Sequence, residues 1–165
     1  MVIINLVVAI SALVVSAISL GFSIHFWRRS FRPIVTAIVK THSGGNIAIL
    51  YDLVILNSGT IPAKNLRLRA DEGSLTAALG QDATAKNKAR WLVCFTDKMS
   101  IPLLHNGDRT SCSFGTSKAN NAGFWKYKAA IAITLTYEGW FGKTYEQNQE
   151  IYIVDSDSFT DGKWS

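Results

Sequence analysis

Few side chains in this sequence stand in an arrangement that could perform catalysis. The histidines lie far apart and form neither an H-E-x-x-H motif nor a zinc-binding Cys/His cluster; they are His25, His42 and His105. The cysteines, Cys94 and Cys112, form no C-x-x-C motif, and neither a G-x-S-x-G elbow nor a phosphate-binding loop occurs. We therefore predict no catalytic residue, no metal site and no cofactor, and a protein that is not an enzyme.

One carboxylate has an unusual setting. Asp52 lies in the middle of the apolar run Ile47–Asn57, where an unpaired charge would be costly to bury. Three readings remain open: a charge paired within the core, a group that contacts a ligand or faces a pore, or a side chain that faces solvent at a sheet edge. The carboxylates of Asp71 and Glu72 fit a solvated turn.

Basic side chains offer a possible binding site for an anion. The chain has a net charge of +5, but residues 33–165 hold 14 basic and 12 acidic side chains, a net charge of only +2. Alternation along a strand would place several basic side chains on one face. An aromatic ring beside lysines can stack on a nucleobase while the lysines bind phosphate. The candidate ligand-binding residues are Lys64, Arg67 and Arg69, then Lys86, Lys88 and Arg90, then Trp125 and Lys126. The alternative is that each cluster is a solvated face.

The chain that carries these residues has two segments of very different composition, an apolar N-terminal run and a longer mixed segment after it. Residues 2–27 contain no Asp, Glu, Lys or Arg, and this apolar run of 26 residues exceeds the roughly 20 that a membrane-spanning helix needs. No basic residue precedes the run, as a cleaved signal peptide would require, and the run is too long for one. We predict a transmembrane helix at residues 1–28, a basic juxtamembrane linker at 29–33, a β-sandwich domain at 34–154 and a polar acidic tail at 155–165.

The charges that flank the span predict its direction. Arg28, Arg29 and Arg32 follow it directly, and positive flanks stay in the cytoplasm. We therefore expect the N-terminus outside and the C-terminal domain in the cytoplasm, at a bacterial inner membrane. Trp27 suits the headgroup boundary, where it would contact lipid together with these arginines. The two cysteines could be free thiols in a reducing compartment or one disulfide in a periplasmic domain.

Small and polar residues recur along one face of the predicted membrane helix. They are Asn5, Ala9, Ala12, Ser16, Ser19 and Ser23. Membrane helices associate through small residues that allow close approach and through polar residues that hydrogen-bond across the interface. This stripe favours a homo-oligomer, or the wall of a narrow pore, although Ala and Ser are common enough in spans for a stripe to arise by chance.

From Pro33 onward the pattern is that of β structure. Short runs rich in Val, Ile and Thr are separated by turn residues, and no long helix is indicated. The predicted strands are Ile34–Thr41, Ile47–Asn57, Leu66–Ala70, Arg90–Phe95, Thr110–Phe114, Ala129–Tyr137 and Lys143–Val154. Residues 71–88 are a polar connector or one short helix. The predicted fold class is an all-β soluble domain, an antiparallel Ig-like sandwich or barrel of about seven strands, preceded by one N-terminal transmembrane helix.

Three turns carry distinctive motifs: residues 57–65 (NSGTIPAKN), 104–108 (LHNGD) and 137–142 (YEGWFG). They resemble the N-x-G-x-x-P-A-x-N, L-x-P-G-E and Y-x-D-x-F-G turns of a set of small bacterial membrane-anchored β-sandwich proteins. The sequence departs from those motifs at two places. The second turn reads His-Asn-Gly-Asp where Pro-Gly-Glu is usual, and the third reads Glu-Gly where Asp often stands. The resemblance implies the sandwich fold and supplies no catalytic residue, because turn motifs serve the fold.

Two functions fit this layout. The first is a non-enzymatic membrane effector whose cytoplasmic domain binds an anionic signal, such as a cyclic oligonucleotide, and acts through an oligomeric helix. The layout resembles effectors of bacterial nucleotide-signalled antiphage defence. The second is a structural or accessory subunit that docks on a larger membrane complex, with Trp125, Trp140 and Phe141 as candidate anchors. Membrane lipid is a partner in either case.

Overall fold

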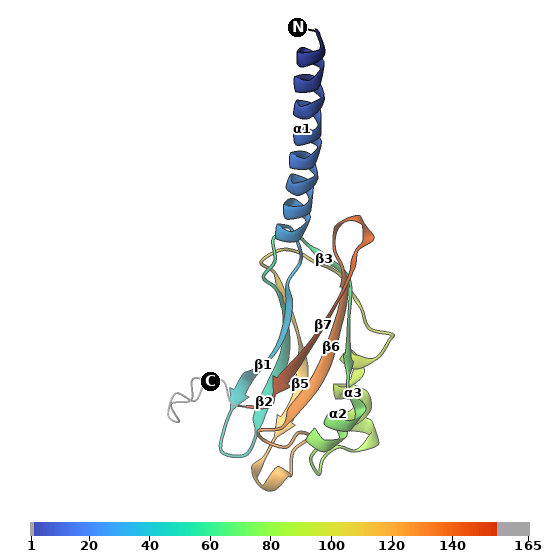
Figure 1. The fold of residues 1–165 in the computed structure, drawn as a ribbon. Helices are drawn as coiled ribbons and strands as arrows, with labels where there is room; N and C mark the ends of the chain where they lie inside the picture. The colour runs from blue at the N-terminus through green and yellow to red at the C-terminus, as the bar shows by residue number, and fades with distance from the viewer. Residues whose placement is uncertain (1, 155–165) are drawn as a thin grey trace. The chain divides into compact units, whose positions relative to one another are not determined.

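The computed structural model describes residues 2–154, so the predicted acidic tail lies outside the described residues. The chain divides into two compact units, residues 1–32 and residues 33–165 (Figure 1). The first unit holds the helix α1, and the second holds the strands.

Helix α1 (Val2–Ser30) is long and apolar enough to cross a membrane. Its 29 residues extend over about 43 Å at 1.5 Å per residue, more than the roughly 30 Å of a hydrocarbon core. The helix runs beyond the predicted boundary at residue 28, so the linker predicted at 29–33 begins as helix. Arg28 and Arg29 therefore lie in the last turn, where positive charge interacts favourably with the helix dipole.

At least one hydroxyl of the small-residue stripe is used within α1. Ser16 Oγ donates a hydrogen bond to the carbonyl oxygen of Ala12 at 2.8 Å. Because this hydroxyl already has an acceptor in its own helix, Ser16 would contribute its small size to any helix–helix interface more than a hydrogen bond across it. Self-association of the helix stays a prediction.

The second unit is an antiparallel β-sandwich, which confirms the predicted fold class. One sheet has the strand order β1-β2-β5 and the other has the order β4-β3-β6-β7 (Figure 1). The strands are β1 (Val35–Gly44), β2 (Ile49–Asn57), β3 (Ala63–Ala70), β4 (Ile101–Leu104), β5 (Arg109–Ser117), β6 (Ala130–Glu138) and β7 (Thr144–Tyr152). Each pair of neighbouring strands is antiparallel.

Alternation along the strands selects the side chains that enter the core. In β3, Leu66 and Leu68 are buried whereas Arg67 and Arg69 are exposed, as the sequence pattern predicts. Both sheets contribute to one core between them. Its largest fully buried side chains are Trp125, Tyr51, Phe114, Phe124, Leu53, Leu66, Ile131, Leu135, Ile151 and Ile153.

The segment between β3 and β4 is helical where the sequence pattern indicates a strand. It contains α2 (Glu72–Ala78), α3 (Ala85–Trp91) and the 3-10 helix η1 (Val93–Phe95). The predicted strand Arg90–Phe95 is therefore wrong. The reason is helix capping, because the side chains of Asp71 and Thr84 each accept a hydrogen bond from the backbone N–H three residues later and so begin α2 and α3.

Trp125 is the largest fully buried side chain of the core. Its ring centroid lies 4.8 Å from that of Phe114 and 4.6 Å from that of Phe124, and its indole N–H donates to the carbonyl of Phe114. Gly115, with a φ of +83°, leaves room for this ring, because a Cβ there would lie 3.0 Å from the indole nitrogen. The prediction that Trp125 stacks on a ligand or anchors a partner is therefore wrong, because the ring is not accessible.

A buried amide joins the two sheets at the first turn motif. Asn57 has no exposed surface. Its Nδ2 donates to the carbonyl oxygens of Ile61 at 2.8 Å and Leu104 at 3.2 Å. Its Oδ1 accepts from the backbone N–H groups of Gly59 at 3.0 Å and Ile34 at 3.2 Å. One side chain thus holds together the residue before β1, the turn after β2 and the end of β4.

We predict that Asn57→Ala lowers the free energy of unfolding of the sandwich by about 3–5 kcal/mol, because it leaves buried N–H and carbonyl groups without partners at roughly 1–3 kcal/mol each. The measurement is urea denaturation of the full chain in detergent micelles, followed by tryptophan fluorescence. Asn148→Ala is the matched control: Asn148 accepts one exposed hydrogen bond from Thr134, so we expect a change within about 0.5 kcal/mol. Equal losses in the two variants would contradict the role of Asn57.

Candidate binding site

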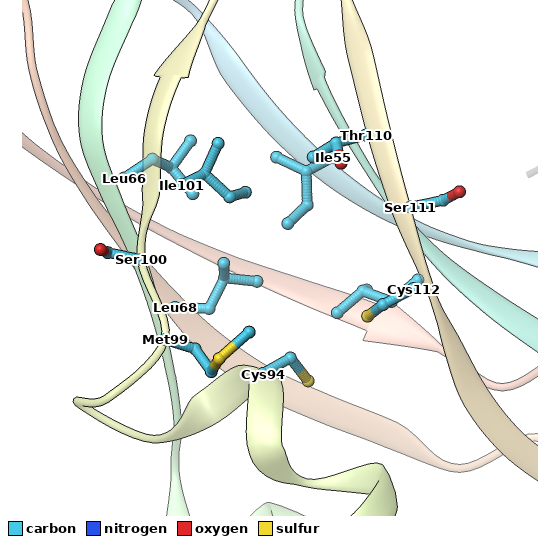
Figure 2. A pocket seen from close by; sticks show the side chains of 11 residues that line it. Ile55, Leu66, Leu68, Cys94, Met99, Ser100, Ile101, Thr110, Ser111 and Cys112 are labelled. Atoms are coloured by element: carbon cyan, nitrogen blue, oxygen red, sulfur yellow. The ribbon is translucent and has the colours of Figure 1, made fainter.

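An apolar cavity opens between the edges of β4 and β5 (Figure 2). Its apolar wall comes from Leu53, Ile55, Leu66, Leu68, Met99 and Ile101. The volume is about 190 Å³, smaller than the roughly 300–1,000 Å³ of most small-molecule sites. A space of this size and lining suits one apolar side chain or a short aliphatic group.

The register of β2 and β5 explains why polar and sulfur-bearing side chains reach the mouth of this cavity. Thr110 is the partner of Ile55, and Cys112 is the partner of Leu53. Directly paired residues share a face of the sheet, so both side chains lie on the face that covers the core. Because β5 is the last strand of its sheet, Cys112 stays exposed at the rim.

The two sides of the sandwich where its sheets end differ in the hydrogen bonds made by the edge strands. On the side of β1 and β7, the side-chain amide of Gln149 donates to the carbonyl of Ala37 and accepts from its N–H, so it satisfies the backbone of that one residue of β1. On the side of β4 and β5, no strand among residues 2–154 pairs with the outer edge of β5 along residues 109–113. Unpaired strand edges are templates for pairing with another chain. The apolar cavity therefore lies beside a strand edge that can accept a further strand.

Two free thiols lie at the mouth of the cavity. Cys94 comes from η1 and is half-buried, whereas Cys112 comes from β5 and is exposed. Figure 2 places both among the residues that line the cavity. The thiol of Cys94 has two acceptors in reach, the carbonyl oxygen of Trp91 at 3.7 Å and the sulfur of Cys112.

The interaction between the two thiols shifts the pKa values of the two cysteines in opposite directions. The hydrogen bond from Cys94 favours the thiolate of Cys112 and lowers the pKa of Cys112, although burial and the charge of Asp52 act in the opposite direction. The same contact, together with burial, raises the pKa of Cys94. Cys112 is therefore the nucleophilic thiol of the pair.

Asp52, the carboxylate with the unusual setting, is paired and lies outside the cavity. Its Oδ2 is 2.9 Å from Nδ1 of His42, and its cross-strand neighbour in β1 is Lys40. A quarter of its side chain is exposed. The geometry combines parts of two of the three readings: Asp52 is paired, as in the first, but it lies on the outer face of the central strand β2 and not in the core or at a sheet edge.

The first predicted basic cluster lies on the outer face of β3. Lys64 and Arg67 are exposed there. Arg69 is exposed as well, but its Nη2 lies 2.9 Å from Oδ1 of Asp97, so its charge is already paired. The three side chains come from one strand, as predicted, and point away from the cavity.

The second and third clusters do not assemble as the sequence pattern predicts. Lys86, Lys88 and Arg90 lie on α3, where a spacing of two places Lys88 on a different face from the other two, so the prediction of one shared face is wrong. The guanidinium of Arg90 stacks 4.4 Å from the ring centroid of Trp91. Lys126 Nζ donates to the carbonyl oxygen of Ala77 at 2.8 Å. Since Trp125 is buried, the eight predicted residues form no single anion site.

The family match covers the helix and the sandwich together. A family model described as a domain of unknown function, DUF8453, matches residues 1–160. The chain belongs to this DUF8453 family. No curated protein matches the chain. The resemblance to bacterial membrane-anchored sandwich proteins is tested by neither comparison and stays a prediction.

No local sequence signal marks the cavity of this DUF8453 chain. Leu66 and Leu68 show ordinary core alternation, and Met99 lies in a connecting segment. Cys94 meets Cys112 because the α3–η1 segment folds back beside β5. The sequence does carry one local signal for this region: the capping residues Asp71 and Thr84, which predict the helices α2 and α3 before β4.

We predict that iodoacetamide alkylates Cys112 before Cys94, and at a lower pH than an ordinary thiol requires, because the thiolate of Cys112 is stabilised by its neighbour. Cys94→Ala removes the donor, so the pKa of Cys112 should rise and its alkylation at neutral pH should slow several-fold. The measurement is the alkylation rate of each cysteine against pH, read by peptide mass spectrometry. Ser100→Ala, another change in the cavity wall, should leave the rate unchanged. An unchanged pH profile in Cys94→Ala would refute the assignment.

Proposed function

We propose that this DUF8453 protein is a non-enzymatic, membrane-anchored binding protein whose sandwich holds an extended segment of a partner protein at the β4–β5 side. The observation that carries this proposal is the apolar cavity that opens directly beside the unpaired edge of β5. Helix α1 would keep the sandwich at the bilayer, next to partners that are themselves in the membrane.

Strand addition explains why the edge and the cavity occur together. An extended segment that pairs with β5 would exchange backbone hydrogen bonds along residues 109–113, which is the source of affinity in this mode of recognition. Every second side chain of the added strand would point toward the core side, where the cavity lies. An apolar side chain there would contact Met99 and Ile101, and this requirement would provide specificity.

This proposal corresponds to the accessory-subunit role: the sandwich docks on a larger membrane complex while α1 anchors it in the bilayer. The apolar lining favours a protein segment over an anion, and the dispersed basic residues supply no converging charge. The arginines at the end of α1 support a cytoplasmic domain at a bacterial inner membrane. Several copies could associate through the small-residue stripe of α1.

The second candidate is the effector that binds an anionic signal, such as a cyclic oligonucleotide in antiphage defence. The observation that favours it is the exposed pair Lys64 and Arg67 on the outer face of β3. In an oligomer, several subunits could each bring this pair to one ligand.

The first candidate is tested by photo-cross-linking in the membranes of the native host. We expect a photoreactive phenylalanine at Met99, beside the cavity mouth, to give a discrete adduct with a partner protein. The same group at Glu146, exposed on the outer face of β7, should give none. Thr110→Trp, which fills the mouth, should abolish the Met99 adduct while the unfolding midpoint confirms that the sandwich is folded.

Two outcomes would overturn the accessory role. Equal adducts at Met99 and Glu146 would show that contact at the cavity is not specific. An adduct with twice the mass of the chain would assign the edge of β5 to a second copy instead of another protein.

For the second candidate we predict that a cyclic di-, tri- or tetranucleotide at about 100 times its dissociation constant stabilises the full chain in detergent by roughly 2.7 kcal/mol, measured as thermal unfolding. The effect should be lost in Arg67→Ala and kept in Lys40→Ala, a basic residue of the other sheet. Stabilisation by none of these ligands would contradict the effector role.

A further inference from the structure

We propose that Cys94 and Cys112 are an oxidation site that forms a reversible disulfide across the mouth of the cavity and so links η1 to β5. The formation of this disulfide does not depend on the proposed function. Its consequence, closure of the cavity against a partner, does rest on it.

The placement of the two cysteines carries the proposal. They come from separate elements, η1 and β5, which meet only in the folded sandwich. Both line the same cavity, and both are free thiols (Figure 2). Their side chains lie at the same cavity mouth and interact with each other (Figure 2).

The exposure of Cys112 also needs an explanation. Free cysteines are among the most buried residues in proteins, whereas Cys112 is exposed at a strand edge. An accessible thiol with a second thiol beside it is the usual arrangement of a redox-sensitive pair, in which the first is oxidised and the second resolves the product. The favoured thiolate of Cys112 and the raised pKa of Cys94 give the two residues these roles.

The chemistry balances with a peroxide as oxidant. The thiolate of Cys112 attacks one oxygen of hydrogen peroxide, the O–O bond breaks, and the released hydroxide takes up a proton and leaves as water. The sulfur of Cys112 is now a sulfenic acid. Cys94 then loses its proton, its sulfur bonds to that of Cys112, and the S–O bond breaks to release a second water. Two thiols and one peroxide thus give one disulfide and two waters, and a dithiol reductant restores the thiols by exchange.

The disulfide would act on the cavity because of where its two ends lie. Cys112 stands beside Thr110 on the rim from β5, and Cys94 precedes Met99 on the opposite rim. A covalent link between these rims would hold η1 against the edge of β5. The space that a partner side chain must enter would then be covered. In a reducing compartment the thiols are the resting state, so the disulfide would be a response to oxidant.

The test of the site uses the full chain in detergent micelles, treated with hydrogen peroxide, alkylated, digested without reductant and analysed by mass spectrometry. We expect a peptide pair joined through Cys94 and Cys112 that is lost on treatment with dithiothreitol. Cys94→Ser should stop at a sulfenic acid on Cys112, trapped as a dimedone adduct. Cys112→Ser should slow the oxidation of Cys94 at least tenfold.

Three results would overturn the site. One is a disulfide only between two chains, seen as a dimer on a non-reducing gel. Another is equal oxidation of the remaining cysteine in the two serine variants. The third is a pair found fully oxidised after rapid alkylation of unstressed cells, because the disulfide would then be permanent and not reversible.

A second measurement separates this inference from the proposed function. Peroxide should abolish the photo-adduct at Met99 in the otherwise unchanged chain and leave it intact in Cys112→Ser. If the disulfide forms but the adduct persists, closure of the cavity is refuted while the oxidation site stands. If no adduct forms even under reducing conditions, the proposed function fails, and the linked peptide still decides the oxidation site.

Discussion

The buried amide of Asn57 is the constraint on which the rest of the sandwich depends. A polar side chain without exposed surface is tolerated only when its donors and acceptors are satisfied. Asn57 meets that condition through four backbone groups, two in the turn that follows it and two, at Ile34 and Leu104, that are distant in sequence. Because its partners include Leu104 at the end of β4 and Ile34 just before β1, the amide determines where the chain passes between the two sheets. The position of β4, and therefore of the cavity beside it, follows from this arrangement.

The two sides of the sandwich where its sheets end differ in their contacts. On the side of β1 and β7, the side-chain amide of Gln149 forms hydrogen bonds with the backbone N–H and carbonyl of Ala37 and so links β7 to β1. Among residues 2–154, the opposite side has an edge of β5 with which no strand pairs, an apolar cavity and two thiols at the cavity mouth. An unpaired strand edge beside an apolar space is a liability for a protein, because it can pair with unrelated chains. A binding role, with a thiol pair that can close the site, gives a physical reason for keeping it.

Charge has less influence on this molecule than its composition suggests. Arg28, Arg29 and Arg32, which carry three positive charges of a chain whose net charge is +5, stand at or just after the end of α1 and not on the sandwich. On the sandwich, Arg69 is paired with Asp97, and the basic side chains of α3 lie on different faces of the helix. Of the first predicted basic cluster, Lys64 and Arg67 on the outer face of β3 remain for an anion. An apolar and backbone-directed mode of binding is therefore better supported than an electrostatic one.

The sequence by itself determined the features that depend on neighbours along the chain. These are the apolar helix, the alternation of β3, the approximate strands and the turn motif at residues 57–65. Only the tertiary structure decided that Trp125 is buried and that Cys94 lies beside Cys112 at the cavity mouth. The physical reason is that burial, strand order and side-chain proximity depend on contacts between residues far apart in sequence. A pattern of alternation cannot show which edge of a sheet remains open or which thiols lie beside it.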